Sequence, residues 1–289
     1  VRLWGESAYA DDSSRLAVPL ILKVATNREE MMVPRASVGR VYKQILSDFE
    51  FAEEKLPPTW DNNNIARVTS YAVKGFLGQV HLYMEEYDEA QPYFEEVIGN
   101  PAYQLVPGSA YNDLFQGKTE FSSESLWEIN YVVDMKQNIW ENGLGSGIAL
   151  VLAPPGRGWS NCTPHGVNIE RFGSDPRLGF CTYAPTDLVA DINGNMTPAG
   201  ISEFNHSGHS FRKYVPQDYC VYATNRNSGI NYLVMRLADV YLMYAEVMNE
   251  LGNDVIAAEY TNKVRRRAYS RNFNASQPDI DYNVTGIQL

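Results

Sequence analysis

Two pairs of small residues, each twelve positions apart, constrain the fold of this 289-residue chain more than any other sequence feature. Gly78 and Ala90 form the first pair, and Ala245 and Ala257 form the second. Small residues at this spacing let two antiparallel helices approach closely, while a large residue such as Phe94 fills the groove beside them. The spacing is typical of tetratricopeptide-like units. It predicts two helical pairs that lie far apart in the sequence.

Apolar residues follow a helical period in both regions that contain these pairs. In residues 39–56 they recur at steps of three and four, and Pro57 ends the run. Thr69 stands before the next apolar run, where it would serve as an N-cap. The sequence therefore predicts a mainly α fold with a helical frame over residues 39–101 and 232–270.

Residues 102–231 separate the two parts of this frame and have a different composition. Residues 125–133 are rich in bulky and branched side chains and predict a strand. From Asn138 onward the segment is dense in Gly, Pro, Asn and Ser and sustains no helical period. We expect a loop-rich insertion with a few short strands inside a single domain of residues 1–289. Long irregular segments of compact domains are usually functional, so we expect the binding site here.

The charge balance narrows the classes of ligand. The formal net charge is −11, which disfavours binding to nucleic acid or to anionic lipid and favours a neutral ligand. Three widely spaced cysteines, Cys162, Cys181 and Cys220, form no zinc-binding motif. His206 and His209 lie three apart in a loop but lack evident further metal ligands. We therefore expect neither a metal nor a cofactor.

The late helical region carries a family resemblance. Residues 235–252, MRLADVYLMYAEVMNELG, followed by AAEYTNKVRRRA at 257–268, resemble a helical pair of SusD/RagB proteins, and ESLWEINY, SDPRLGF and FRKYVP agree in order. The resemblance implies lipid-anchored glycan-binding proteins on the outer membrane of a Bacteroidetes-like bacterium. It also implies a SusC-like TonB-dependent transporter as the partner that receives the glycan.

Two departures from the family pattern concern the ends of the chain. No cysteine precedes Cys162, although the family's lipidated cysteine lies near the mature N-terminus, and the sequence ends at Leu289, where family members usually continue. We expect a chain truncated at both ends. Its membrane attachment would depend on an N-terminal lipid anchor outside this sequence.

A glycan site needs exposed aromatic platforms for the apolar face of the sugar ring and polar side chains for its hydroxyl rim. Trp140 and Trp159 lie between Gly- and Pro-rich turns, although burial in the core remains open for both. Trp4 is a further candidate. Replacing Trp140 or Trp159 by Ala is predicted to abolish glycan binding. The polar candidates that flank the two indoles are Asn138, Asn142, Arg157, Asn161 and His165.

Two other function classes, an enzyme and a protein-interaction scaffold, fit the sequence less well than a glycan binder. No nucleophile elbow, P-loop, dinucleotide fingerprint or HExxH helix occurs in the sequence, so we expect no enzyme. Helical repeats also serve as protein-interaction scaffolds, which is the alternative. The long insertion with its Trp and Asn residues favours the glycan binder. The run Arg265-Arg266-Arg267 is predicted to pair with nearby acids or helix-end carbonyls rather than to bind an anion.

Overall fold

The computed structural model describes residues 15–133, 144–201, 207–224 and 226–283. The chain divides into two compact units. The helical unit comprises residues 1–101, 239–260 and 286–289, and the insert unit comprises residues 102–238 and 261–285. Four candidate site residues lie outside the described residues: Trp4, Asn138, Trp140 and Asn142.

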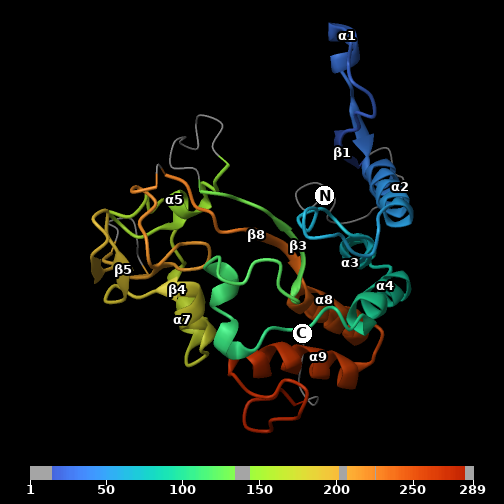
Figure 1. The fold of residues 1–289 in the computed structure, drawn as a ribbon. Helices are drawn as coiled ribbons and strands as arrows, with labels where there is room; N and C mark the ends of the chain where they lie inside the picture. Colours follow the sequence, from blue (N-terminus) through green and yellow to red (C-terminus); the bar gives the residue numbers. More distant parts are fainter. Residues whose placement is uncertain (1–14, 134–143, 202–206, 225, 284–289) are drawn as a thin grey trace. The chain divides into compact units, whose positions relative to one another are not determined.

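Five long helices confirm the prediction of a mainly α fold. Three of them, α2, α3 and α4, follow one another in the helical unit (Figure 1). Two more, α8 and α9, come after the insertion, and α9 continues into the insert unit from Thr261. Their bounds are α2 Val38–Lys55, α3 Ser70–Tyr83, α4 Tyr87–Gly99, α8 Leu237–Glu250 and α9 Asp254–Ala268.

Close packing of α3 on α4 depends on Gly78, as the repeat spacing predicts. A Cβ atom added to Gly78 would lie 2.6 Å from Cε1 of Phe94. Phe94 and Ala90 are fully buried. Thr69 caps α3, since its side chain accepts a hydrogen bond from the backbone N–H of Ala72 at 3.2 Å. The predicted cap and the predicted small-residue contact are therefore both present.

Aromatic residues join α8 to the beginning of α9. The ring of Tyr260 lies edge-on to Tyr241 and to Tyr244, with centroid distances of 5.0 and 4.8 Å. The hydroxyl of Tyr244 donates a hydrogen bond to Glu95 of α4 at 2.9 Å. The second helical pair therefore packs through tyrosines as well as through the buried Ala245 and Ala257.

A narrow arm extends from α2 within the helical unit (Figure 1). It consists of strands β1 (Leu16–Pro19) and β2 (Arg35–Ser37), which pair antiparallel, and the short helix α1 (Arg28–Met31). Ala17 and Ala36 of the arm join the core cluster at the start of α2, which includes Val41 and Tyr42. The arm is thus anchored at its base by apolar packing.

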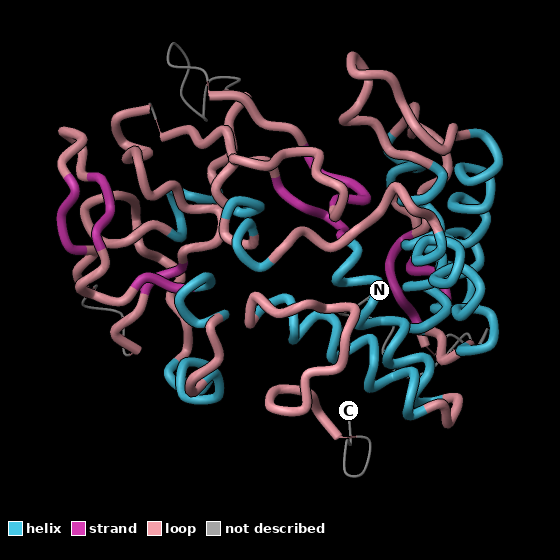
Figure 2. Tube along the Cα trace, turned by 60° about the horizontal axis from the view of Figure 1, so that its bottom comes forward, coloured by secondary structure: helices cyan, strands magenta, loops and turns pink. Residues whose placement is uncertain are grey.

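The insert unit contains short elements linked by long loops (Figure 2). Its described strands form three antiparallel pairs, β3 with β8, β4 with β7, and β5 with β6. This agrees with the predicted insertion of loops and a few short strands. The bounds are β3 Ser125–Ile129, β4 Thr182–Tyr183, β5 Leu188–Ala190, β6 Met196–Pro198, β7 Ser210–Phe211, β8 Tyr232–Arg236, α5 Ile148–Leu152, α6 Gly166–Phe172 and α7 Arg177–Cys181.

A buried carboxylate fixes the strand β3 to the end of α9. Glu124 has no solvent exposure, and its Oε2 accepts hydrogen bonds from Arg267 at 2.6 Å and from the backbone N–H of Val106 at 3.0 Å. Its Oε1 accepts one from Arg236 at 3.3 Å. Charge-assisted hydrogen bonds of this kind are the strong ones in a protein interior.

Among the described residues, no helix combines the length and the apolar character that a membrane span requires.

Candidate functional site

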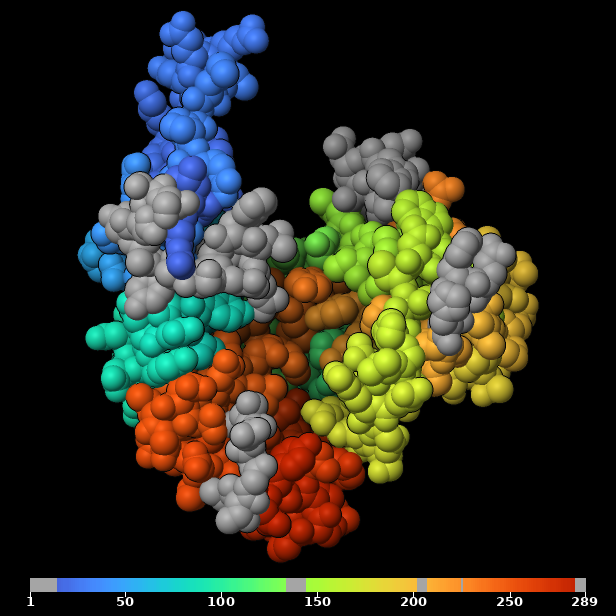
Figure 3. Space-filling view, turned by 180° about the vertical axis from the view of Figure 1, so that it is seen from behind, coloured from blue at the N-terminus to red at the C-terminus, as the bar shows by residue number. Residues whose placement is uncertain are grey.

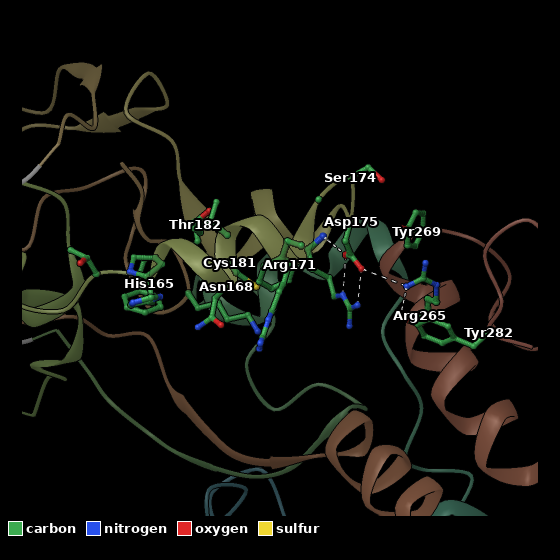
Figure 4. A pocket seen from close by; sticks show the side chains of 18 residues that line it. His165, Asn168, Arg171, Ser174, Asp175, Cys181, Thr182, Arg265, Tyr269 and Tyr282 are labelled. Carbon is green, nitrogen blue, oxygen red and sulfur yellow. Dashed lines mark hydrogen bonds and ion pairs between the residues drawn. The ribbon is translucent and has the colours of Figure 1, made fainter. Parts of the chain in front are cut away.

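A pocket of about 1010 Å³ lies within the insert unit, between α6, α7, the end of β7 and the last turn of α9 with the segment that follows it (Figure 4). Seen from behind, the yellow-green surface around α6 and α7 borders the red surface of the segment after α9 (Figure 3). Residues roughly a hundred positions apart in sequence therefore form one site.

One face of α6 lines the pocket with polar side chains. His165 is the N-cap of this helix, and its Nδ1 accepts a hydrogen bond from the backbone N–H of Val167 at 3.3 Å. Asn168 and Arg171 follow at steps of three, which places them on the same face of a helix. All three side chains line the pocket (Figure 4). They offer hydrogen-bond donors and acceptors suited to hydroxyl groups.

An ion-pair network holds the other end of the pocket. Asp175 accepts two side-chain hydrogen bonds from Arg177, at 2.9 and 2.7 Å, and lies 3.9 Å from the guanidinium of Arg265 (Figure 4). Burial would raise the pKa of Asp175, but the hydrogen bonds and charges of the two arginines outweigh burial and lower it. The carboxylate is therefore ionised and already occupied by its partners.

Aromatic rings supply the apolar part of the pocket. Arg265 lies over the rings of Tyr282 and Tyr269, with its guanidinium carbon 4.4 and 5.2 Å from their centroids. The hydroxyl of Tyr282 accepts a hydrogen bond from Arg265 at 2.9 Å, and 47% of this residue is exposed. Phe172 and Phe211 line the same pocket. Tyr282 is thus a half-exposed residue in a fixed position with Arg265 over one face of its ring, which leaves the other face as the candidate platform for a sugar.

The described candidates from the sequence are not all brought together. The described candidates are Arg157, Trp159, Asn161 and His165, and of these His165 lines the pocket. Trp159 is 43% exposed, and its backbone N–H donates to Leu150 of α5 at 2.7 Å. Asn161 is exposed beside it and bonds through its backbone to the next residue of α5. Trp159 and Asn161 therefore lie outside the pocket lining.

Arg157 has a clear structural role. Its guanidinium donates hydrogen bonds to the carbonyl oxygens of Thr197 and Pro198 in β6, at 3.2 and 3.1 Å, and to the carbonyl oxygen of Pro155 at 3.1 Å. These bonds tie the loop after α5 to the hairpin of β5 and β6. A guanidinium engaged in this way has few donors left for a ligand.

Apart from His165, the residues that shape the pocket are not among the candidates that the sequence offers. The segment SDPRLGF, which contains Asp175 and Arg177, enters only through the family resemblance, and the triple arginine is predicted only to pair with acids or helix-end carbonyls. That pairing prediction is confirmed, since Arg266 binds Asp281 at 2.8 and 2.7 Å and Arg267 binds Glu124. The available signal was the presence of tyrosines, Tyr269 and Tyr282, on either side of a loop just after the arginines.

Metal ligands do not cluster in the part of the chain that the structure describes. No group of three or more His, Cys, Asp or Glu side chains there is arranged to hold a metal ion. His206 lies outside the described residues.

Comparison with known proteins gives consistent relatives. The model of the SusD family matches residues 180–287. The SusD-like protein P25 of Formosa agariphila is 23% identical over 293 aligned residues, which cover 93% of this chain and 53% of that protein. A SusD-like protein of Bacteroides ovatus is 25% identical, and the alignment covers 93% of this chain and 50% of that protein. The chain spans about half the length of the curated relatives it matches.

Solved structures share the fold. A laminarin-binding SusD-like protein superposes with a TM-score of 0.69 at 24% identity, covering 87% of this chain and 58% of that chain. Surface glycan-binding protein A of Bacteroides thetaiotaomicron, in complex with laminarihexaose, superposes with a TM-score of 0.69 at 21% identity. The superposition covers 87% of this chain and 57% of that chain. The family-model match over residues 180–287, the curated relatives and the shared fold agree, so this chain is similar to SusD-like proteins in sequence and shares their fold.

Proposed function

We propose that this chain binds oligosaccharides in the pocket of the insert unit. The observation that carries the proposal is Tyr282, a half-exposed aromatic residue that lines the same pocket as hydrogen-bonding side chains from α6. Sugar rings offer an apolar C–H face and a rim of hydroxyl groups. A pocket with aromatic walls and a few placed polar groups matches both features.

The similar structures support a glycan as the ligand class. One of them is described as laminarin-binding, another is in complex with laminarihexaose, and a third contains a xylogluco-oligosaccharide. These ligands belong to those proteins, and their variety shows that the shared fold accommodates different sugars. For this chain the choice of sugar depends on its own pocket.

The physiological setting forms part of the same proposal. SusD-like proteins are glycan-binding proteins rather than enzymes, and the resemblance implies surface display through a lipid anchor and delivery of the glycan to a TonB-dependent transporter. For this chain, the outer-membrane location and the SusC-like partner remain proposals. Co-purification with a TonB-dependent transporter from the native membrane would test them.

The chemistry of the pocket favours binding over hydrolysis. Glycosidases use two carboxyl groups about 5 to 9 Å apart, one of which is held protonated. In the pocket lining Asp175 is the one carboxylate, and its arginine partners lower its pKa. A carboxylate in that state is a poor proton donor. We therefore expect no release of reducing sugar when the chain is incubated with polysaccharides.

Replacing Tyr282 by Ala tests the site. The backbone N–H and carbonyl of Tyr282 bond to Asn262, at 2.8 and 3.1 Å, and both bonds survive the substitution. Loss of a central aromatic anchor typically costs more than 1 kcal/mol of binding energy, so we expect about a tenfold loss of affinity. Isothermal titration calorimetry with a panel of neutral and acidic hexasaccharides measures it.

Tyr83→Ala is the matched control, because Tyr83 is a comparably exposed tyrosine at the end of α3 in the helical unit. Its removal should leave affinity unchanged. Equal affinities of the wild type and Tyr282→Ala for every bound sugar would refute this site. If no sugar of the panel binds the wild type, the alternative of a helical scaffold for protein partners is favoured.

A further inference from the structure

We propose that the pocket selects acidic glycans, with Arg171 and Lys213 binding a carboxylate or a sulfate ester of the sugar. This inference rests on the proposed function and specifies its ligand class. The net charge of the whole chain suggests a neutral ligand, but the charge that a ligand meets is the charge of its pocket.

The pocket lining is strongly cationic. Four basic side chains line it, and Asp175 is the one acidic side chain in the lining. Asp175 is shared between Arg177 and Arg265, which satisfies the carboxylate and partly neutralises those two arginines. One positive charge is left over on the pair Arg177 and Arg265, and the rest of the excess lies on the remaining two residues, Arg171 and Lys213.

Neither of these two cations has an acidic partner among the residues that the structure describes. Arg171 is exposed on α6 and has no ion pair or hydrogen bond there. Lys213 is half-buried, and its ammonium group lies 4.3 Å from the ring centroid of Phe115 and 5.5 Å from that of Tyr111. An aromatic face compensates a desolvated ammonium only in part, so an anion beside Lys213 would be bound favourably.

The excess of acidic residues elsewhere does not cancel this local charge. At physiological ionic strength charges are screened over about 8 Å, so carboxylates on distant surfaces contribute little inside the pocket. The pocket also supplies a neutral hydrogen-bonding side chain, Asn168, on the same face of α6 as Arg171. A sugar can thus place its ring on Tyr282 and its anionic group toward Arg171 and Lys213.

The experiment compares three hexasaccharides of different charge by calorimetry at 50 mM NaCl. They are a neutral β-glucan hexamer, a galacturonic acid hexamer and a sulfated galactan hexamer. The variants are Arg171→Gln with Lys213→Met, and a matched control, Lys118→Gln with Arg226→Gln, which removes two exposed cations of the same unit that do not line the pocket. Met retains the apolar stem of Lys213 against Phe115.

We expect one or both acidic hexamers to bind the wild type at least tenfold more tightly than the neutral hexamer. The pocket variant should lose about tenfold or more in affinity for the acidic hexamers, because it lacks both cations, and it should retain its affinity for the neutral hexamer. Raising NaCl to 500 mM should weaken the acidic hexamers selectively. The acidic hexamer whose affinity falls in the pocket variant identifies the preferred anion as a carboxylate or a sulfate.

Three results would overturn the inference. Equal or tighter binding of the neutral hexamer shows a glycan site without acidic selectivity, and the proposed function then stands alone. An equal loss in the control variant shows that the effect is general electrostatics. If none of the hexamers binds, the inference and the proposed function both fail.

Discussion

Glu128 is a buried carboxyl group whose titration is coupled to folding. It lies on β3 and is 3% exposed. Burial raises the pKa of Glu128 to about 7, and the charge of Glu120 adds to this rise, while hydrogen bonds from the backbone N–H of Phe121 and from Asn231 oppose it. Near pH 6 the folded chain therefore holds a proton on Glu128 that the unfolded chain releases.

The sign of the pH dependence follows from this difference. Between about pH 4.5 and pH 7 the folded state binds the extra proton, so the contribution of Glu128 to stability falls as pH rises through this window. The loss is at most about 3 kcal/mol at roughly 1.4 kcal/mol per pKa unit. Glu128→Gln should remove this fall, whereas Glu170→Gln, on the exposed surface of α6, should keep it. Urea unfolding at pH 5, 6, 7 and 8 measures the effect, and parallel profiles for both variants would contradict it.

At the scale of the element, α3 and α4 show how a sequence spacing becomes a packing distance. An added Cβ at Gly78 would meet three ring atoms of Phe94 at 2.6 to 2.9 Å. The ring is fully buried, so it has little room to move. The glycine therefore matters through the space that it leaves rather than through its backbone freedom.

Gly78→Ala should destabilise the chain although Ala is the better helix former. The gain in helix propensity is about 1 kcal/mol, and overpacking of a core typically costs 1 to 3 kcal/mol. We expect a net loss of about 1 kcal/mol in the free energy of unfolding. Gly99→Ala, at the end of α4 where an added Cβ meets nothing within 4 Å, should be neutral or stabilising. Urea denaturation of both variants decides, and a Gly78→Ala chain as stable as the wild type would contradict the packing argument.

Helices were predictable from the sequence because their determinants are local. The apolar stripe predicts a helix over residues 39–56, and both ends of α2 lie within one residue of these bounds. The predicted N-cap Thr69 directly precedes the first residue of α3. The end of α3 was less predictable. The helix ends at Tyr83, because Glu85 adopts a left-handed backbone conformation before α4 begins.

At the scale of the whole molecule, the pocket proposed as the site is only partly predictable from the sequence. The sequence placed it in residues 102–231 and included His165, which does line the pocket. Its aromatic wall comes from Tyr269 and Tyr282, about a hundred residues later in the chain. Such a wall depends on how α9 and the following loop pack against α6 and α7 within the insert unit. No local pattern of composition reports that packing.

Trp159 remains the competing platform. It is exposed, as a sugar-binding indole must be, but it lies outside the pocket lining. The two locations make different demands on a bound glycan. A sugar at Trp159 would rest beside α5, whereas a sugar in the pocket would contact α6 and the segment after α9.

The structure of the chain crystallised with the tightest-binding hexasaccharide tests the central claim most directly. We predict sugar density against the ring of Tyr282, with hydroxyl groups within hydrogen-bond distance of Asn168 or His165. Density stacked on Trp159 instead, with the pocket between α6 and the segment after α9 empty of sugar, would contradict the account.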